Sequence, residues 1–85
     1  MEKRIDTLFS DEQLAFVLGS AEASELRNKV MAEGECPVEL DGAGWGRLRQ
    51  TLGADFGITG AEQESWLVVF AYTVNGVKLT RLLQR

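Results

Sequence analysis

The sequence predicts a small α+β domain with a helical first half, a short strand and a C-terminal β-hairpin. Apolar residues recur at helical spacing between residues 10 and 33, and again between residues 45 and 52. Residues 66–74 and 77–83 are two β-favouring runs separated by Asn75-Gly76, and this dipeptide between two such runs is the strongest short-range signal for a hairpin. A chain of 85 residues has the length of one domain, so we assign residues 1–85 to a single domain.

The first helical segment begins at a capping box formed by Ser10 and Gln13. In such a box the Ser oxygen accepts a hydrogen bond from the amide three residues later, and the Gln side chain accepts one from the Ser amide. One apolar stripe then follows at i, i+3, i+4 and i+7, made of Leu14, Val17, Leu18 and Ala21.

A break is expected at Gly19-Ser20, because the apolar stripe resumes at Leu26 and Val30 with a shift of one residue. Either one helix bends there or Ser20 caps a second helix. In both cases we expect helical structure to reach residue 32 or 33 and Gly34 to end it, since glycine adopts the left-handed conformation of a helix end at little cost.

A short strand and another helix follow. Val38 and Leu40 lie on one face of an extended segment over residues 37–40. Asp41 then precedes a helix whose buried stripe we expect to be Trp45, Leu48 and Leu52. Gly53 is expected to end this helix, and residues 55–58 are expected to form a loop.

A second capping box, Thr59 to Glu62, predicts a further helix of about two turns before Trp66. The resulting order, helix, strand, helix, turn, helix and hairpin, resembles that of winged-helix domains. The resemblance lies in the order of the elements alone. It implies a helix-turn-helix-like pair whose second helix would enter a nucleic-acid groove.

A two-residue type I′ turn at Asn75-Gly76 would pair Tyr72 with Leu79 and Phe70 with Arg81. On this register the opposite face of the hairpin carries Leu67, Val69 and Leu82. Because the first strand is apolar on both faces, we expect it to be covered on both sides. The helices can cover one side. We therefore predict self-association through these three residues, most simply as a homodimer.

The residues for common enzyme chemistry are missing. The chain has no histidine, which excludes Ser-His and Cys-His nucleophile pairs. Its single cysteine, Cys36, lies near Glu33 and Glu35, whose charges disfavour a thiolate. The acidic residues lack the spacing of a calcium-binding loop, and the glycines at residues 42–46 match no nucleotide-binding motif. We expect a protein that is not an enzyme and binds no cofactor or metal.

The location is expected to be the cytoplasm. A single cysteine cannot form an internal disulfide, which fits a reducing compartment. No apolar run approaches the roughly 20 residues of a membrane-spanning helix, and the residues after Met1 do not form the apolar segment of a signal peptide. We expect no membrane association.

Charge is distributed unevenly along the chain, whose net charge is −4. Residues 1–45 carry four basic and ten acidic side chains, a net charge of −6, whereas residues 46–85 carry five basic and three acidic ones, a net charge of +2. Such asymmetry bears on partners rather than on fold. We expect the partner-binding residues to be acidic, namely Glu33, Glu35, Glu39, Asp41, Glu62 and Glu64.

These observations favour a small acidic protein-binding module, a regulator or inhibitor that docks on a basic surface of a larger protein. A phage or mobile-element inhibitor of a nucleic-acid-handling enzyme is one form of this function. One alternative is a dimeric winged-helix transcriptional regulator that contacts DNA through Arg47, Arg49, Lys78 and Arg81. Against it, Glu62 and Glu64 would face the phosphates, so nucleic acid is not the expected partner. The other alternative is a structural subunit of an oligomer or phage particle.

Overall fold

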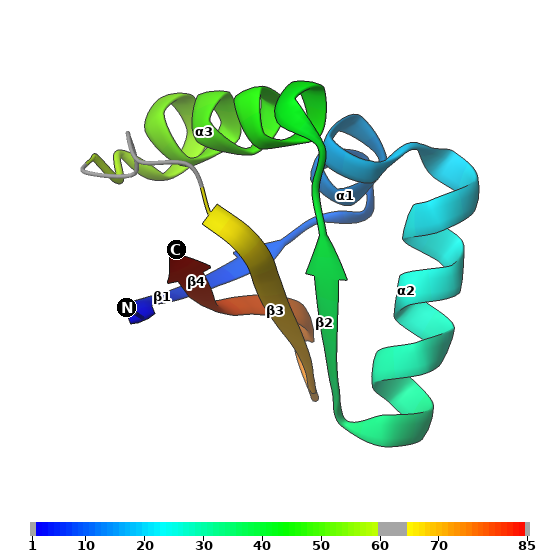
Figure 1. Cartoon of the computed structure of the whole chain (residues 1–85). Helices are drawn as coiled ribbons and strands as arrows, with labels where there is room; N and C mark the ends of the chain where they lie inside the picture. The colour runs from blue at the N-terminus through cyan, green and yellow to red at the C-terminus, as the bar shows by residue number, and fades with distance from the viewer. Residues whose placement is uncertain (1, 60–64, 85) are drawn as a thin grey trace.

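The structure, a computed structural model, describes residues 2–59 and 65–84 (Figure 1). The predicted α+β class is confirmed. In chain order the elements are β1 (Glu2–Phe9), α1 (Asp11–Leu18), α2 (Ser20–Glu33), β2 (Glu35–Glu39), α3 (Gly42–Phe56), β3 (Ser65–Thr73) and β4 (Gly76–Gln84).

The strands form one antiparallel sheet in the order β1-β4-β3-β2. All three helices contribute to a single hydrophobic cluster on one face of this sheet. On the other face, which we call the outer face, alternate residues of the edge strands are exposed, including Glu35, Pro37 and Glu39 of β2. An antiparallel sheet with one covered and one solvated face accounts for this alternation.

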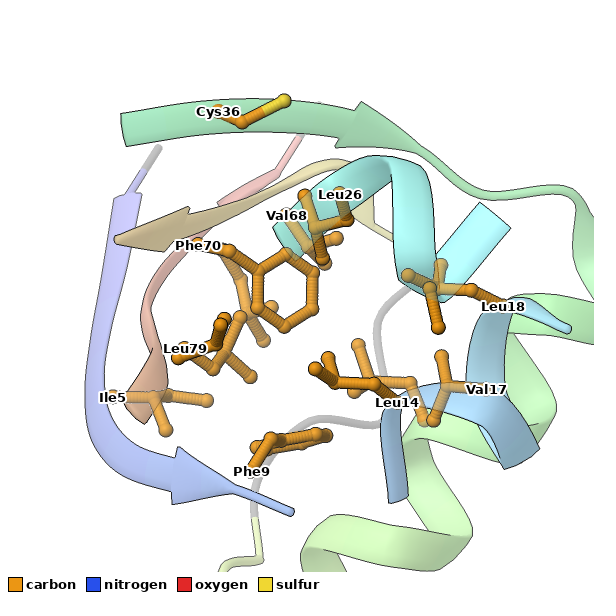
Figure 2. Packing of buried hydrophobic residues seen from close by; sticks show 14 of the residues in the cluster. Ile5, Phe9, Leu14, Val17, Leu18, Leu26, Cys36, Val68, Phe70 and Leu79 are labelled. Carbon is orange, nitrogen blue, oxygen red and sulfur yellow. The ribbon is translucent and has the colours of Figure 1, made fainter. Parts of the chain in front are cut away.

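The core lies between the sheet and the helices. Figure 2 shows Phe70 and Leu79 directed into the same space as Leu14 of α1, and all three side chains have no exposed surface. The Phe9 ring is 5.9 Å from that of Phe70 and 5.2 Å from that of Phe56 between centroids. Aromatic contacts of this kind join β1 and the end of α3 to the centre of the sheet.

Strand β1 was not expected from the sequence. It pairs with β4, so that Glu2 lies opposite Leu83 and Phe9 opposite Val77. Ile5 and Phe9 are buried, whereas most of the residues between them are polar. A register shift between Arg4 and Thr7 interrupts the alternation. The local pattern is therefore weak, and the strand depends on a partner more than 60 residues away in sequence.

The predicted features of the first helical segment are confirmed. The Gln13 amide donates to Ser10 Oγ at 3.1 Å, and the Ser10 amide donates to Gln13 Oε1 at 2.8 Å. Gly19, with φ of 93°, separates two helices, and Gly34, with φ of 85°, ends the second. One detail was wrong: Ala21 is exposed, because α2 starts on a new phase and buries Ala23.

Helix α3 is longer than the sequence predicted. Asp41 caps its start, where Oδ1 accepts a hydrogen bond from the Gly44 amide at 2.7 Å. The helix continues through Gly53, which was expected to end it, and stops at Gly57, whose φ of 64° is left-handed. The last turn is held in place because Phe56 stacks on Phe9 of β1. This tertiary contact outweighs the low helix propensity of Gly53.

The C-terminal hairpin is confirmed, but its predicted turn is displaced by one residue. Thr73 pairs with Gly76, which places Val74 and Asn75 in the turn. The Thr73 hydroxyl stabilises this arrangement, since it donates to the Gly76 carbonyl at 2.9 Å and accepts from the Asn75 amide at 3.1 Å.

The predicted strand register is wrong for the same reason. Phe70 lies opposite Leu79 rather than Arg81, and Tyr72 lies opposite Val77 rather than Leu79. Beyond this point a second shift changes the pairing, because Val69 faces Arg81 and leaves Thr80 as the extra residue of a bulge. Side chains of β4 after the bulge therefore point to the face opposite to the one predicted.

The predicted helix before Trp66 lies on residues 60–64, which are outside the described part of the chain. The winged-helix-like arrangement requires that helix and stays a prediction. The described elements around it agree with the predicted order, because α2, β2, α3 and the β3–β4 hairpin follow one another.

Candidate functional site

A groove between helix α2 and strand β2 is the candidate site. In Figure 1 the two elements run beside each other, and two neighbouring cavities of about 440 and 320 Å³ lie along them. Both cavities are lined by Leu18, Glu22 and Glu39. We call this space the α2–β2 groove and define it by an apolar floor and an acidic rim: the floor is Leu18, Leu26, Cys36, Val38 and Leu40, and the rim is Glu22, Glu25, Glu39 and Asp41.

The local sequence explains how the rim is built. Glu22 and Glu25 are three residues apart on α2, so they lie on the same side of the helix. Glu39 ends β2 and lines the groove from the edge of the sheet, although the alternation along β2 places its side chain on the outer face. Asp41 caps the start of α3. All four rim residues are exposed.

The floor consists of side chains with different degrees of burial. Leu26 is 3% exposed and Leu18 is 8% exposed, and both belong to the hydrophobic core. Val38 and Leu40 are only half-buried and pack against that core from its edge. The floor therefore offers apolar surface that a bound side chain could cover.

Two of the six acidic residues predicted as partner-binding, Glu39 and Asp41, lie on the groove. Glu33 is exposed at the end of α2, and Glu35 lies on the outer face of the sheet. Glu62 and Glu64 are outside the described residues. Sequence reasoning missed Glu22 and Glu25, although their spacing on one helix face was a visible signal. It gave no indication of which strand that face would meet.

Strand β2 is an edge of the sheet, and Pro37 is placed so as to protect that edge. The Tyr72 amide donates to the Gly34 carbonyl at 3.0 Å, and hydrogen-bonded pairs alternate along an antiparallel ladder. In this register Pro37 lies opposite Val69 at a non-hydrogen-bonded position, where the backbone nitrogen and carbonyl point away from β3. A proline there cannot donate to an incoming strand, a known protection of sheet edges.

The electrostatics of the groove are dominated by carboxylates. Among the described residues, no hydrogen bond or ion pair engages the side chains of Glu22, Glu25 or Glu39. Two cations also line the groove, Lys29 and Arg47. The Arg47 guanidinium is directed inward, because it donates to the Val17 carbonyl at 3.1 and 3.3 Å.

The basic residues predicted as an alternative nucleic-acid contact do not share one surface. Arg47 and Arg49 belong to α3, whereas Lys78 and Arg81 lie on the outer face of the sheet. Lys78 contacts Asp6 at 2.8 Å.

Arg81 is held between carboxylates from two other strands. It contacts Glu2 of β1 at 3.1 Å and Glu35 of β2 at 2.7 Å. Hydrogen bonds to Glu2 and then to Glu35 raise the pKa of the guanidinium above its usual range. Its charge is thus already matched within the chain.

The residues predicted for self-association are separated by the fold. Leu82 has no exposed surface and lies in the helix-facing core, because the bulge at Thr80 reverses its direction. Val69 stays on the outer face but is only 1% exposed. Its cross-strand neighbours, Pro37 and Arg81, flank it on both sides. Leu67 is half-buried on the same face.

The described residues include no group of three His, Cys, Asp or Glu side chains that could hold a metal ion. None of the helices in the described ranges has the length and apolar character needed to span a membrane. Comparisons with protein-family models, curated proteins and solved structures found no match to this chain.

Proposed function

We propose that this protein is a non-enzymatic protein-binding module that docks its acidic surface on a basic surface of a larger protein. The observation that carries the proposal is the excess of carboxylates on the rim of the α2–β2 groove, which outnumber the cations that line it, Lys29 and Arg47. Arg27, Lys78 and Arg81 form ion pairs within the chain. Carboxylates on the rim of the α2–β2 groove have no such partner among the described residues, so they are available to an external cation.

The same distribution gives the proposed association its physical character. Exposed carboxylates that are not neutralised within the chain attract a basic surface over a distance of about one Debye length, ~8 Å at physiological ionic strength. Such attraction raises the association rate and selects partners by charge. Occupying a basic surface would block other ligands of that surface, which is how the module would act as a regulator or inhibitor.

Affinity capture from a lysate of the native host, followed by mass spectrometry and by calorimetry with the purified partner, tests this function. We expect a partner with a basic surface and an affinity that falls as salt rises from about 50 to 300 mM. A purified partner that is acidic, or an affinity that does not respond to salt, would contradict the proposal.

We also propose a two-fold dimer through the outer face of the sheet. The helices do not cover this face, and it carries half-buried Leu67, Ala71 and Leu83 beside Leu8, which is 45% exposed. A two-fold axis would bring the same patch of both subunits together.

A further inference from the structure

We infer, building on the proposed function, that the α2–β2 groove is the docking site and that its occupant is a basic segment with an apolar side chain between arginines or lysines. The apolar side chain would cover Val38 and Leu40 of the floor, which are half-buried. The flanking cations would meet the carboxylates of the rim.

Charge complementarity selects this occupant, because four acidic residues line the groove against two basic ones, Lys29 and Arg47. Glu22 and Glu25 lie on α2, whereas Glu39 lines the groove from the edge of the sheet, with its side chain on the outer face. A segment lying in the groove therefore meets an excess of negative charge. An apolar segment without cations would leave these carboxylates desolvated and unpaired, which costs free energy.

The backbone of β2 limits how the segment binds. Addition of a strand to an open sheet edge uses a regular row of backbone donors and acceptors. Pro37 interrupts this row in the middle of β2, at a position that points away from β3. Recognition in the groove thus depends on side chains, that is, on the floor and the rim.

A peptide titration of the ¹⁵N-labelled protein, followed by NMR, tests the apolar part of this inference. The probe is a capped pentapeptide with a central leucine and two arginines on each side, and its control has serine in place of leucine. We expect the leucine peptide to shift the amide signals of Leu18, Glu22 and Val38. It should bind about tenfold more tightly than the serine peptide, because a buried leucine contributes at least that factor. Equal affinities, or no binding of either peptide, would overturn the inference.

A matched pair of double variants tests the acidic part. Glu22→Lys with Glu25→Lys takes the net charge of the four rim residues from −4 to 0, whereas Glu12→Lys with Glu33→Lys makes the same change in net charge outside the groove. Glu12 matches Glu22 because both lie in the first turn of a helix. We expect the rim variant to bind the leucine peptide at least tenfold more weakly than the control variant.

Equal losses in the two variants would overturn the groove as the site, while the acidic module of the proposed function would stand. The proposed function itself depends on the purified partner and its response to salt. The amide spectrum of each variant shows whether it is folded. If the rim variant is unfolded, the comparison of the two peptides on the wild-type protein decides the matter.

Discussion

Gly76 shows how a single backbone conformation constrains the hairpin. It follows the turn with a φ of 131°, a value that residues with a side chain rarely adopt, although a Cβ there would meet no atom within 4 Å. The constraint is therefore conformational strain rather than a steric clash.

We expect Gly76→Val to lower the free energy of unfolding by more than about 1 kcal/mol, the usual cost of holding a branched residue in a sparsely populated region. Urea denaturation measures this change. Val74→Ala, in the same turn at a side chain that is 95% exposed, is the control and should change stability by less than about 0.5 kcal/mol. Equal stabilities of the two variants would contradict the strain at Gly76.

At Val69, the structure changes the expected effect of a substitution by glutamate. From the sequence, Val69→Glu should give a folded monomer, because the side chain was expected to lie in an exposed interface. Since the side chain is 1% exposed, we now expect a carboxylate there to lower stability by at least about 2 kcal/mol. Thermal unfolding measures the loss, with Leu67→Glu at the neighbouring half-buried position as the comparison. A Val69→Glu protein as stable as wild type would show that the outer face can open.

At the scale of elements, the ends of the helices are set by local hydrogen bonds. Ser10 has the side-chain and backbone contacts of a complete capping box. Ser20 could have capped the next helix, but Gly19 occupies that position, and no side-chain hydrogen bond caps α2 there.

The two serines therefore form a matched pair of substitutions. Ser10→Ala should lower the free energy of unfolding by about 1 kcal/mol, because the Gln13 amide loses its acceptor. Ser20→Ala should change stability by less than about 0.5 kcal/mol. Chemical denaturation of both variants measures the difference. A larger loss for Ser20→Ala would mean that its hydroxyl contributes to the start of α2.

At the scale of the whole molecule, the net charge of −4 and the ion pairs that Arg27, Lys78 and Arg81 form within the chain disfavour binding to nucleic acid. We expect binding to duplex DNA no tighter than the non-specific range, ~10⁻⁴ to 10⁻⁶ M at physiological salt. Fluorescence anisotropy with labelled duplexes of varied sequence measures the affinity. Sub-micromolar binding that depends on sequence would contradict the protein-binding proposal and favour the dimeric regulator.

The proposed dimer has its own test. We expect light scattering to give the mass of a dimer at ~100 μM, well above the micromolar dissociation constants of ordinary interfaces. Leu67→Lys with Leu83→Lys should give a folded monomer, because both side chains lie on the outer face. Phe16→Lys, on exposed surface of α1, is the control and should stay dimeric. A wild-type protein that is monomeric at this concentration would rule out the dimer.

Several local features were determined by the sequence alone. The capping box at Ser10, the break at Gly19, the helix end at Gly34 and the presence of a hairpin each depend on residues a few positions apart. Their energies are set by backbone conformation and neighbouring hydrogen bonds, so the residues close to them in sequence are enough to specify them. The excess of acidic residues in the first half was equally visible.

Only the tertiary structure decided the features that depend on distant partners. Strand β1 exists because β4 pairs with it, and α3 passes Gly53 because Phe56 meets Phe9. The bulge at Thr80 sends Leu82 into the core and leaves Arg81 on the outer face between Glu2 and Glu35. The α2–β2 groove likewise exists only once the helix packs beside the strand. Such packing depends on many weak contacts between residues that are far apart in sequence. A short stretch of sequence therefore cannot specify it.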